Sequence, residues 1–122
     1  MPLSVSTQVS PIGSILIQQT DSNEVADNNI TGAPATVLMV DVDNTANAAE
    51  DAYVKFYNDL APNVGTTDPD WILLIPQGVR RQIVITEGLE FSTGLSVATV
   101  TTPGTPGVLP LGSAVVIRMI CL

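Results

Sequence analysis

The side chains that could do chemistry in this chain are carboxylates, because the sequence has no histidine and one cysteine, Cys121. Without histidine the chain lacks the commonest general base and the commonest zinc ligand. A serine-type triad loses its usual middle member for the same reason, and zinc and iron–sulfur sites are excluded. The apolar neighbours of Cys121 predict a buried, inert thiol. The best remaining candidates are two aspartates, Asp41 and Asp43, at the end of an apolar run.

Asp41 and Asp43 lie in VLMVDVDNT, residues 37–45, where an apolar run leads into Asp-x-Asp-x-Thr. This motif resembles the nucleophile signature of the haloacid dehalogenase-type phosphatases. The resemblance would make Asp41 the group that attacks phosphorus and Asp43 the acid/base. That chemistry also needs a magnesium on further carboxylates, a lysine for the phosphoryl charge and a parallel sheet with crossover helices. The chain has one lysine, Lys55, and it lies inside a predicted strand. We therefore interpret the motif as a strand that runs into an Asp-Asn turn.

Calcium is the metal that carboxylates suit best, because it takes oxygen ligands. The acidic residues close together in sequence are Asp41, Asp43, Glu50 and Asp51 in one group and Asp68 and Asp70 in another. An EF-hand loop beginning at Asp41 would need Gly and Glu where the chain has Ala46 and Ala52. The simpler interpretation is a solvated acidic rim, and we predict neither a metal site nor a cofactor.

The charge balance restricts the partners. Four Lys and Arg against twelve Asp and Glu give a net charge of −8. A nucleic-acid-binding protein needs a basic surface, and an anionic membrane attracts one, so neither partner is expected. A protein partner with basic patches is favoured instead. No Lys or Arg precedes the apolar run IGSILI, which argues against a signal peptide and predicts assembly in the cytoplasm.

Short runs rich in Val, Ile, Thr and aromatic residues recur along the chain and are bounded by turn residues. They predict eight strands, near residues 3–9, 13–19, 35–42, 52–58, 70–76, 80–86, 94–101 and 113–121. Many short strands with regular turn signals, one of them at Glu87-Gly88, are typical of a sandwich. We therefore expect a single all-β domain over residues 1–122, an antiparallel β-sandwich of immunoglobulin-like or jelly-roll type.

Three segments have further expectations attached to them. Residues 44–52, NTANAAEDA, have helix-forming content for at most a short helical turn, with Asn44 as N-cap. Residues 20–34 are polar enough for a mobile loop. The segment AVVIRMIC, residues 114–121, is apolar on both faces except at Arg118, which predicts a central strand.

Two long stretches, residues 1–20 and 91–117, carry no charged side chain. The second contains the loop PGTPGVLPLG, whose Val108, Leu109 and Leu111 predict either a plug over one end of the sandwich or a subunit contact. The first holds two strand-like runs, and its Leu3 and Val5 predict either an arm that pairs with a neighbouring protein or ordinary edge strands.

Arg80 and Arg81 form the only basic cluster. Such a pair more often binds within its own chain than to a partner, and Glu87 or Glu90 across a hairpin would be suitable acceptors. The alternative hypothesis is that Arg80 and Arg81 contact a partner protein.

The pieces VDNTANAAEDAYVKFYN, NVGTTDPD and IPQGVRRQIVITEGLEFSTGLSVA all lie within residues 36–102. This stretch resembles a module of virion proteins in tailed bacteriophages, particularly those that infect cyanobacteria. The similarity covers just over half of the chain and consists of strand and turn residues. It implies a β-sandwich that serves as a capsid decoration (cement) protein or as a module of tail and fibre proteins.

The resemblance implies a non-enzymatic protein located in the virion, with the major capsid protein and further copies of itself as partners. We expect a homotrimer that binds the outer surface of the capsid lattice and stabilises it. The alternative is a tail, neck or fibre module in virion assembly or host recognition. The length of 122 residues favours the capsid, because tail and fibre proteins usually carry such a module within a longer chain.

Overall fold

A computed structural model of the chain describes residues 3–7 and 13–122. Its regular elements are all strands: β1 (Leu3–Thr7), β2 (Ile15–Ser22), β3 (Ala35–Asp43), β4 (Ala52–Asn58), β5 (Trp71–Ile75), β6 (Arg80–Phe91), β7 (Leu95–Val100) and β8 (Val115–Cys121). Each of them overlaps one of the eight predicted strands. Within the described ranges, no helix is long and apolar enough to cross a membrane.

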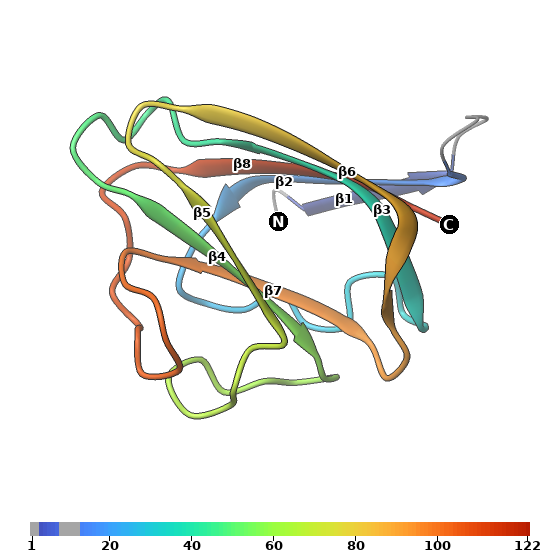
Figure 1. Ribbon diagram of the computed structural model, residues 1–122. Coiled ribbons are helices and arrows are strands. Elements are labelled where there is room, and N and C mark those ends of the chain that lie inside the picture. The colour runs from blue at the N-terminus through green and yellow to red at the C-terminus, as the bar shows by residue number, and fades with distance from the viewer. Residues whose placement is uncertain (1–2, 8–12) are drawn as a thin grey trace.

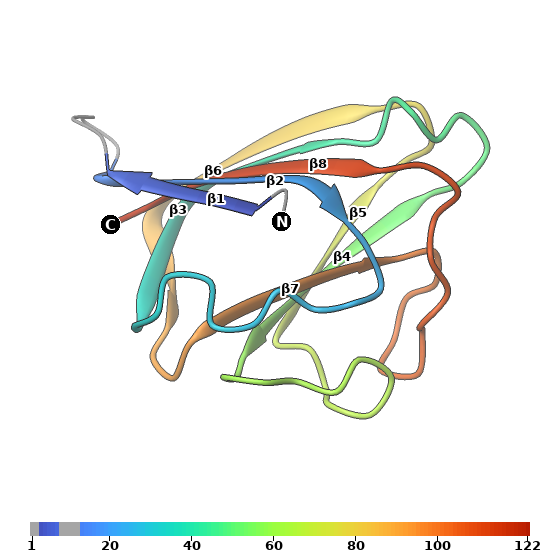
Figure 2. The same cartoon turned by 180° about the vertical axis from the view of Figure 1, so that it is seen from behind.

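The strands form two antiparallel sheets that face each other, which confirms the predicted β-sandwich (Figure 1). The larger sheet has the order β1-β2-β8-β3-β6, and the smaller has the order β5-β4-β7. Strand β8 lies between β2 and β3, as the apolar pattern of residues 114–121 predicted. Viewed from behind, β1 closes one edge of the larger sheet beside β2 (Figure 2).

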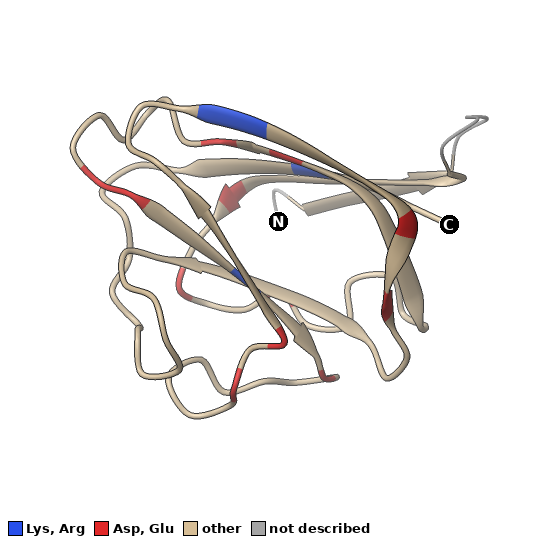
Figure 3. Cartoon of the chain, in the orientation of Figure 1, with Lys and Arg blue, Asp and Glu red and all other residues tan. Residues whose placement is uncertain are grey.

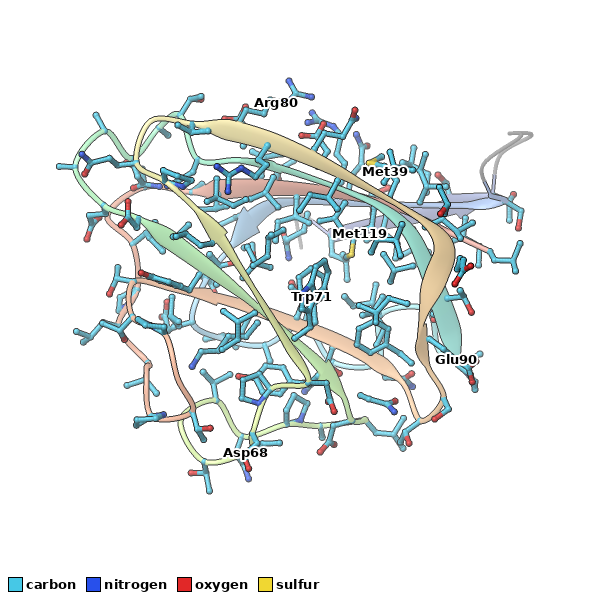
Figure 4. All side chains as sticks on the ribbon, viewed as in Figure 1. Met39, Asp68, Trp71, Arg80, Glu90 and Met119 are labelled. Carbon is cyan, nitrogen blue, oxygen red and sulfur yellow. The ribbon has the colours of Figure 1, made fainter. Side chains whose placement is uncertain are left out.

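Side chains from both sheets alternate into one core. In β8 the inward positions Ile117, Met119 and Cys121 are almost fully buried, and in β4 Val54 and Phe56 are fully buried. Figure 4 shows Met119 and Trp71 between the two sheets. The ring centroids of Phe56 and Trp71 are 4.7 Å apart, so aromatic packing joins neighbouring strands of the smaller sheet as well.

The outer face of the smaller sheet is also largely buried along β4 and β7, which strand alternation alone does not reveal. Lys55 and Tyr57 point away from the core side of β4, yet neither side chain is exposed. All six residues of β7 are buried too. The loop of residues 101–112 covers this face, as its hydrogen bonds from Lys55 demonstrate, while residues 23–34 bond to the backbone of β7 along the edge of the sheet. The protein therefore has a loop outside the smaller sheet.

The predicted turn at Glu87-Gly88 is wrong, because β6 continues to Phe91. Its register against β3 shifts between Val37 and Met39, so the chain passes this point in a bulge. Gly88 has a φ of +79°, and a Cβ there would clash with the side chain of Thr36. Glycine thus permits an irregularity within a strand where the sequence suggested its end.

Residues 44–52, for which we expected at most a short helical turn, form none, since the described residues contain no helix. Residues 44–51 form successive turns that end where β4 begins. Asn44 does not cap a helix; its side chain is fully buried and donates to the backbone carbonyls of Ile75 and Pro76. Tertiary hydrogen bonds outweigh the helix preference of this short alanine-rich segment.

The predicted loop at residues 20–34 begins later, because β2 extends to Ser22. Its remainder is bonded to the edge of β7: Asp27 and Val97 exchange two backbone hydrogen bonds of 2.9 and 3.1 Å, and the Ile30 amide donates to Leu95 at 2.8 Å. A chain segment that extends a sheet edge in this way is not the mobile loop that its polarity suggested.

Residues 3–7 and 15–20, from the predicted arm, pair with each other in the chain's own sheet. β1 and β2 are antiparallel, and Leu3 packs against the core while Val5 is 44% exposed. The described part of residues 1–20 therefore takes the second predicted form, strands of the same sandwich. Residues 1–2 and 8–12 lie outside the described ranges.

Because the thiol of Cys121 is buried, the free energy of unfolding should depend on pH in the alkaline range. Burial raises the pKa of this thiol from 9.0 to about 11. Between these values the unfolded chain loses the thiol proton first, so the free energy of unfolding should fall as pH rises from about 9 to about 11, by up to ~3 kcal/mol. Urea unfolding at pH 8 and pH 11 measures the decline. It should be shallower in Cys121→Ala, and an identical decline in both proteins would contradict the prediction.

Candidate interaction surfaces

Asp41 and Asp43, the pair that resembles a phosphatase nucleophile motif, are held by neighbouring side chains. Asp41 is 4% exposed and forms a bidentate ion pair with Arg80, with N–O distances of 2.6 and 3.0 Å. Asp43 accepts hydrogen bonds from the hydroxyl and the amide of Thr45, which lower its pKa. Their strand, β3, is antiparallel to both of its neighbours, so the phosphatase interpretation lacks the parallel sheet that it requires.

The prediction that Arg80 and Arg81 pair with Glu87 or Glu90 is wrong. Arg80 binds Asp41 on the adjacent strand instead. Arg81 donates from Nη1 to the carbonyl of Leu74 at 3.1 Å, which joins the edge of β6 to β5 in the other sheet. Because β6 does not turn at Glu87-Gly88, the two glutamates lie further along the same strand and never fold back over the arginines.

The carboxylates considered as calcium ligands act as acceptors for separate loops. Residues 3–7 and 13–122 contain no cluster of three or more Asp, Glu, His or Cys side chains that could hold a metal ion. Four of the carboxylates accept from a backbone amide or a hydroxyl: Asp51 from Gln77, Glu50 from Gly112, Asp68 from Thr105 and Asp70 from Asn58. Each of these hydrogen bonds joins the carboxylate to another segment of the chain, so the carboxylates serve the chain's own loops.

The loop formed by residues 101–112 is held by a buried lysine. The Lys55 ammonium donates to the carbonyls of Gly104 and Gly107 at 2.6 and 2.8 Å, with Thr105 more distant at 3.5 Å. No carboxylate contacts this ammonium among the described residues. Burial lowers the pKa of Lys55. The carbonyl oxygens supply the polar environment that a buried cation needs.

The same loop displays apolar side chains to solvent. Val108 is 44% exposed and Leu109 is 59% exposed, whereas Leu111 packs against the core. On its inner side, Val108 contacts Gly65, where an added Cβ would lie 2.5 Å from Val108 Cγ1. The predicted plug over one end of the sandwich is wrong, and the subunit contact stays a prediction. The loop covers the outer face of the smaller sheet, rather than one end of the sandwich, and it presents Val108 and Leu109 outward.

The structure does not bring the seven predicted contact residues together. Leu3 and Val5 lie on β1, at one edge of the larger sheet, and Arg80 and Arg81 lie on β6, at its other edge. The loop of residues 101–112 covers the opposite sheet. These residues therefore form three separate surfaces, and each of them would make its own contact with a partner.

Sequence reasoning missed the outer face of the larger sheet. The cross-strand register places four apolar side chains in one row there, which we call the apolar row: Leu16, Ile120, Met39 and Val84. The alternating apolar residues on the outer side of β8 were the one available signal. Figure 3 shows that acidic residues are spread over several loops and over strands such as β3 and β6, while Lys and Arg are few.

Comparisons with protein-family models, with curated proteins and with solved structures find no match to this chain.

Proposed function

We propose that this protein is a non-enzymatic structural component of a tailed-phage particle, a decoration protein that binds the outer surface of the capsid lattice. The major capsid protein and further copies of this chain, in a homotrimer, are its proposed partners, and the virion is its location. The resemblance of residues 36–102 to phage virion modules motivates this proposal. The net charge of −8 supports a partner with basic patches.

The loop of residues 101–112 is the observation on which the proposal depends. A contact surface binds more strongly when its side chains are already held in place, because less conformational entropy is lost on association. Lys55 fixes the backbone of this loop from beneath, and Val108 and Leu109 project from it into solvent. A rigid loop with exposed apolar side chains suits permanent attachment to a lattice.

The double variant Val108→Ser, Leu109→Ser tests this contact. Both side chains are exposed, so the melting temperature should change by no more than a few degrees. Binding to capsids should weaken by about tenfold or more, since burying each side chain contributes roughly 1.5 kcal/mol or more. Co-sedimentation with capsids of the phage that encodes the protein measures this. Val25→Ser is the matched control, because Val25 is 69% exposed on another loop.

The copy number in purified particles separates the capsid from the tail. A copy number comparable to that of the major capsid protein supports decoration, and a few copies per particle would place the protein in the tail or neck. Particles that contain none of it would overturn the proposal, as would unchanged capsid binding by the double variant.

A further inference from the structure

The two sheets end in the edge strands β1, β6, β5 and β7, and the outer edge of β7 is already occupied. Residues 23–30 run alongside it and form four backbone hydrogen bonds of 2.8–3.1 Å with Leu95, Val97 and Thr99. These hydrogen bonds satisfy the N–H and C=O groups that β7 directs away from β4. A further strand therefore has no place on this edge.

The edges of β6 and β5 are protected in other ways. β6 has a bulge beside Gly88 and several charged side chains, and both features keep other strands from pairing with an edge. Its charged residues are Arg80, Arg81, Glu87 and Glu90. On β5, the carbonyl of Leu74 already accepts a hydrogen bond of 3.1 Å from Arg81, which ties this edge to β6.

Strand β1 has none of these features. Its residues, Leu3–Thr7, include no charged side chain and no proline, and its register with β2 is unbroken. β2 is its one partner among the described residues, and Figure 2 shows β1 at the border of the larger sheet. Alternate residues of an antiparallel strand direct their N–H and C=O groups away from the partner strand. β1 therefore presents unpaired backbone groups along its outer side.

Val5 shows that the sandwich is partly open beside β1. Its side chain lies directly opposite Ile17, so both are on the inner face of the larger sheet. Ile17 is fully buried, whereas Val5 is 44% exposed. The apolar inner face therefore continues to the edge strand, where the described residues leave it in contact with water.

These two features define the chemistry of what can occupy the edge. A row of unpaired N–H and C=O groups pairs with another extended backbone. Side chains on one side of that backbone would lie beside Val5, and those on the other side would lie beside Ser4 and Ser6. The segment that fits therefore alternates apolar and polar residues and has no proline at the paired positions. The net charge of −8 disfavours an acidic segment.

In the proposed homotrimer, on which this step rests, a second copy cannot occupy the edge. The other edge strands of a copy are occupied or protected, so its β1 is the strand that it could offer. Two β1 strands of identical chains would pair about a two-fold axis, whereas a homotrimer has a three-fold axis. The segment should therefore come from a different protein.

We propose that the outer edge of β1 is a strand-addition site, which binds an extended, non-acidic segment of a partner protein with apolar residues at every second position. The added strand extends the larger sheet beyond β1. Its backbone takes up the free N–H and C=O groups, and its apolar side chains cover Val5.

Amide hydrogen exchange, followed by NMR, tests the site with the model peptide Lys-Thr-Val-Thr-Val-Thr-Lys. At about 2 mM peptide, the amides on the outer side of β1 should exchange about threefold more slowly, because a dissociation constant of about 1 mM leaves roughly two thirds of the protein bound. The amides of residues 101–112 should be unaffected. The same peptide with proline in place of both valines should have no effect.

Val5→Lys tests whether the peptide binds at this edge. A charge on the inner side of an edge strand opposes strand addition, so the protection of the β1 amides should be lost. Because Val5 is 44% exposed, the melting temperature should change by no more than a few degrees. Val25→Lys is the matched control, since it adds the same charge at a loop valine that is 69% exposed, and it should bind the peptide like the wild type.

Capsids of the phage that encodes the protein, used in place of the peptide, separate this proposal from the proposed function. If capsids bind but neither they nor the peptide protect β1, the strand-addition site is wrong while the proposed function stands. If the peptide protects β1 but capsids do not bind, the site stands and the proposed function is wrong. Protection of β1 that rises with protein concentration in the absence of peptide would show that a second copy occupies the edge. That result would overturn the proposal, as would equal protection in Val5→Lys.

Discussion

Replacing Lys55 with Met should lower the free energy of unfolding by about 2–4 kcal/mol. The variant keeps most of the buried volume but removes the ammonium that donates to Gly104 and Gly107 at 2.6 and 2.8 Å. Each hydrogen bond from a charged donor contributes about 1.5–3 kcal/mol, and relief of the buried charge offsets part of the loss. Urea unfolding measures the change, which corresponds to roughly 10 °C in melting temperature.

The part of the protein that loses its structure first distinguishes this prediction from general destabilisation. Without the ammonium, the loop of residues 101–112 should detach from the smaller sheet, so thermolysin should cleave near Val108 and Leu109 well before the core unfolds. Arg81→Met is the matched control, because Arg81 makes one exposed hydrogen bond, and its effect should stay below about 1 kcal/mol. If Lys55→Met retains both its stability and its resistance to thermolysin, the lysine does not hold the loop.

Lys55 also marks a limit of sequence-based prediction. Alternation in β4 correctly places Val54 and Phe56 on one face and Lys55 on the other, and a lysine on an outward face normally meets water. Its carbonyl partners come from residues some 50 positions later in the chain. Local pattern cannot reveal that a distant loop folds back over a sheet face.

The strands themselves could be predicted because each is a local run with its own apolar period. The errors lie where tertiary contacts outweigh local preference. Gly88 indicates a turn by composition, yet β3 provides a partner for a bulge, and the strand continues. Residues 44–51 favour helix by composition, but a helix would withdraw Asn44 from its buried hydrogen bonds.

The candidate surfaces also differ in whether local sequence or tertiary structure reveals them. Val108 and Leu109 could be recognised from sequence because two apolar residues in a Pro/Gly loop are unusual within a local window. The apolar row could not, because its four members come from four strands separated by up to 104 positions, from Leu16 to Ile120. Only the sheet order brings them into line, and that order is a property of the whole fold.

Asn44→Ala should lower the free energy of unfolding by about 3–4 kcal/mol, because Asn44 joins three turns from a fully buried position. Its Nδ2 donates to the carbonyls of Glu50, Ile75 and Pro76 at 3.0, 3.3 and 3.2 Å. Its Oδ1 accepts from Asn47, which in turn exchanges two hydrogen bonds with Ser113. Removal leaves several buried polar groups without partners, and each costs about 1–3 kcal/mol.

Two further variants isolate the role of the Asn44 amide. Asn44→Asp keeps the shape but replaces the donor by a carboxylate that faces backbone carbonyls, so it should destabilise at least as much as Asn44→Ala at pH 7. Asn23→Ala is the matched control, since the side chain of Asn23 makes only exposed local hydrogen bonds and its loss should cost less than about 1 kcal/mol. Urea unfolding of the three variants measures the differences. If Asn44→Asp is as stable as the wild type, donation to these carbonyls is not what holds the turns together, and their order must come from the packing of the strands that they connect.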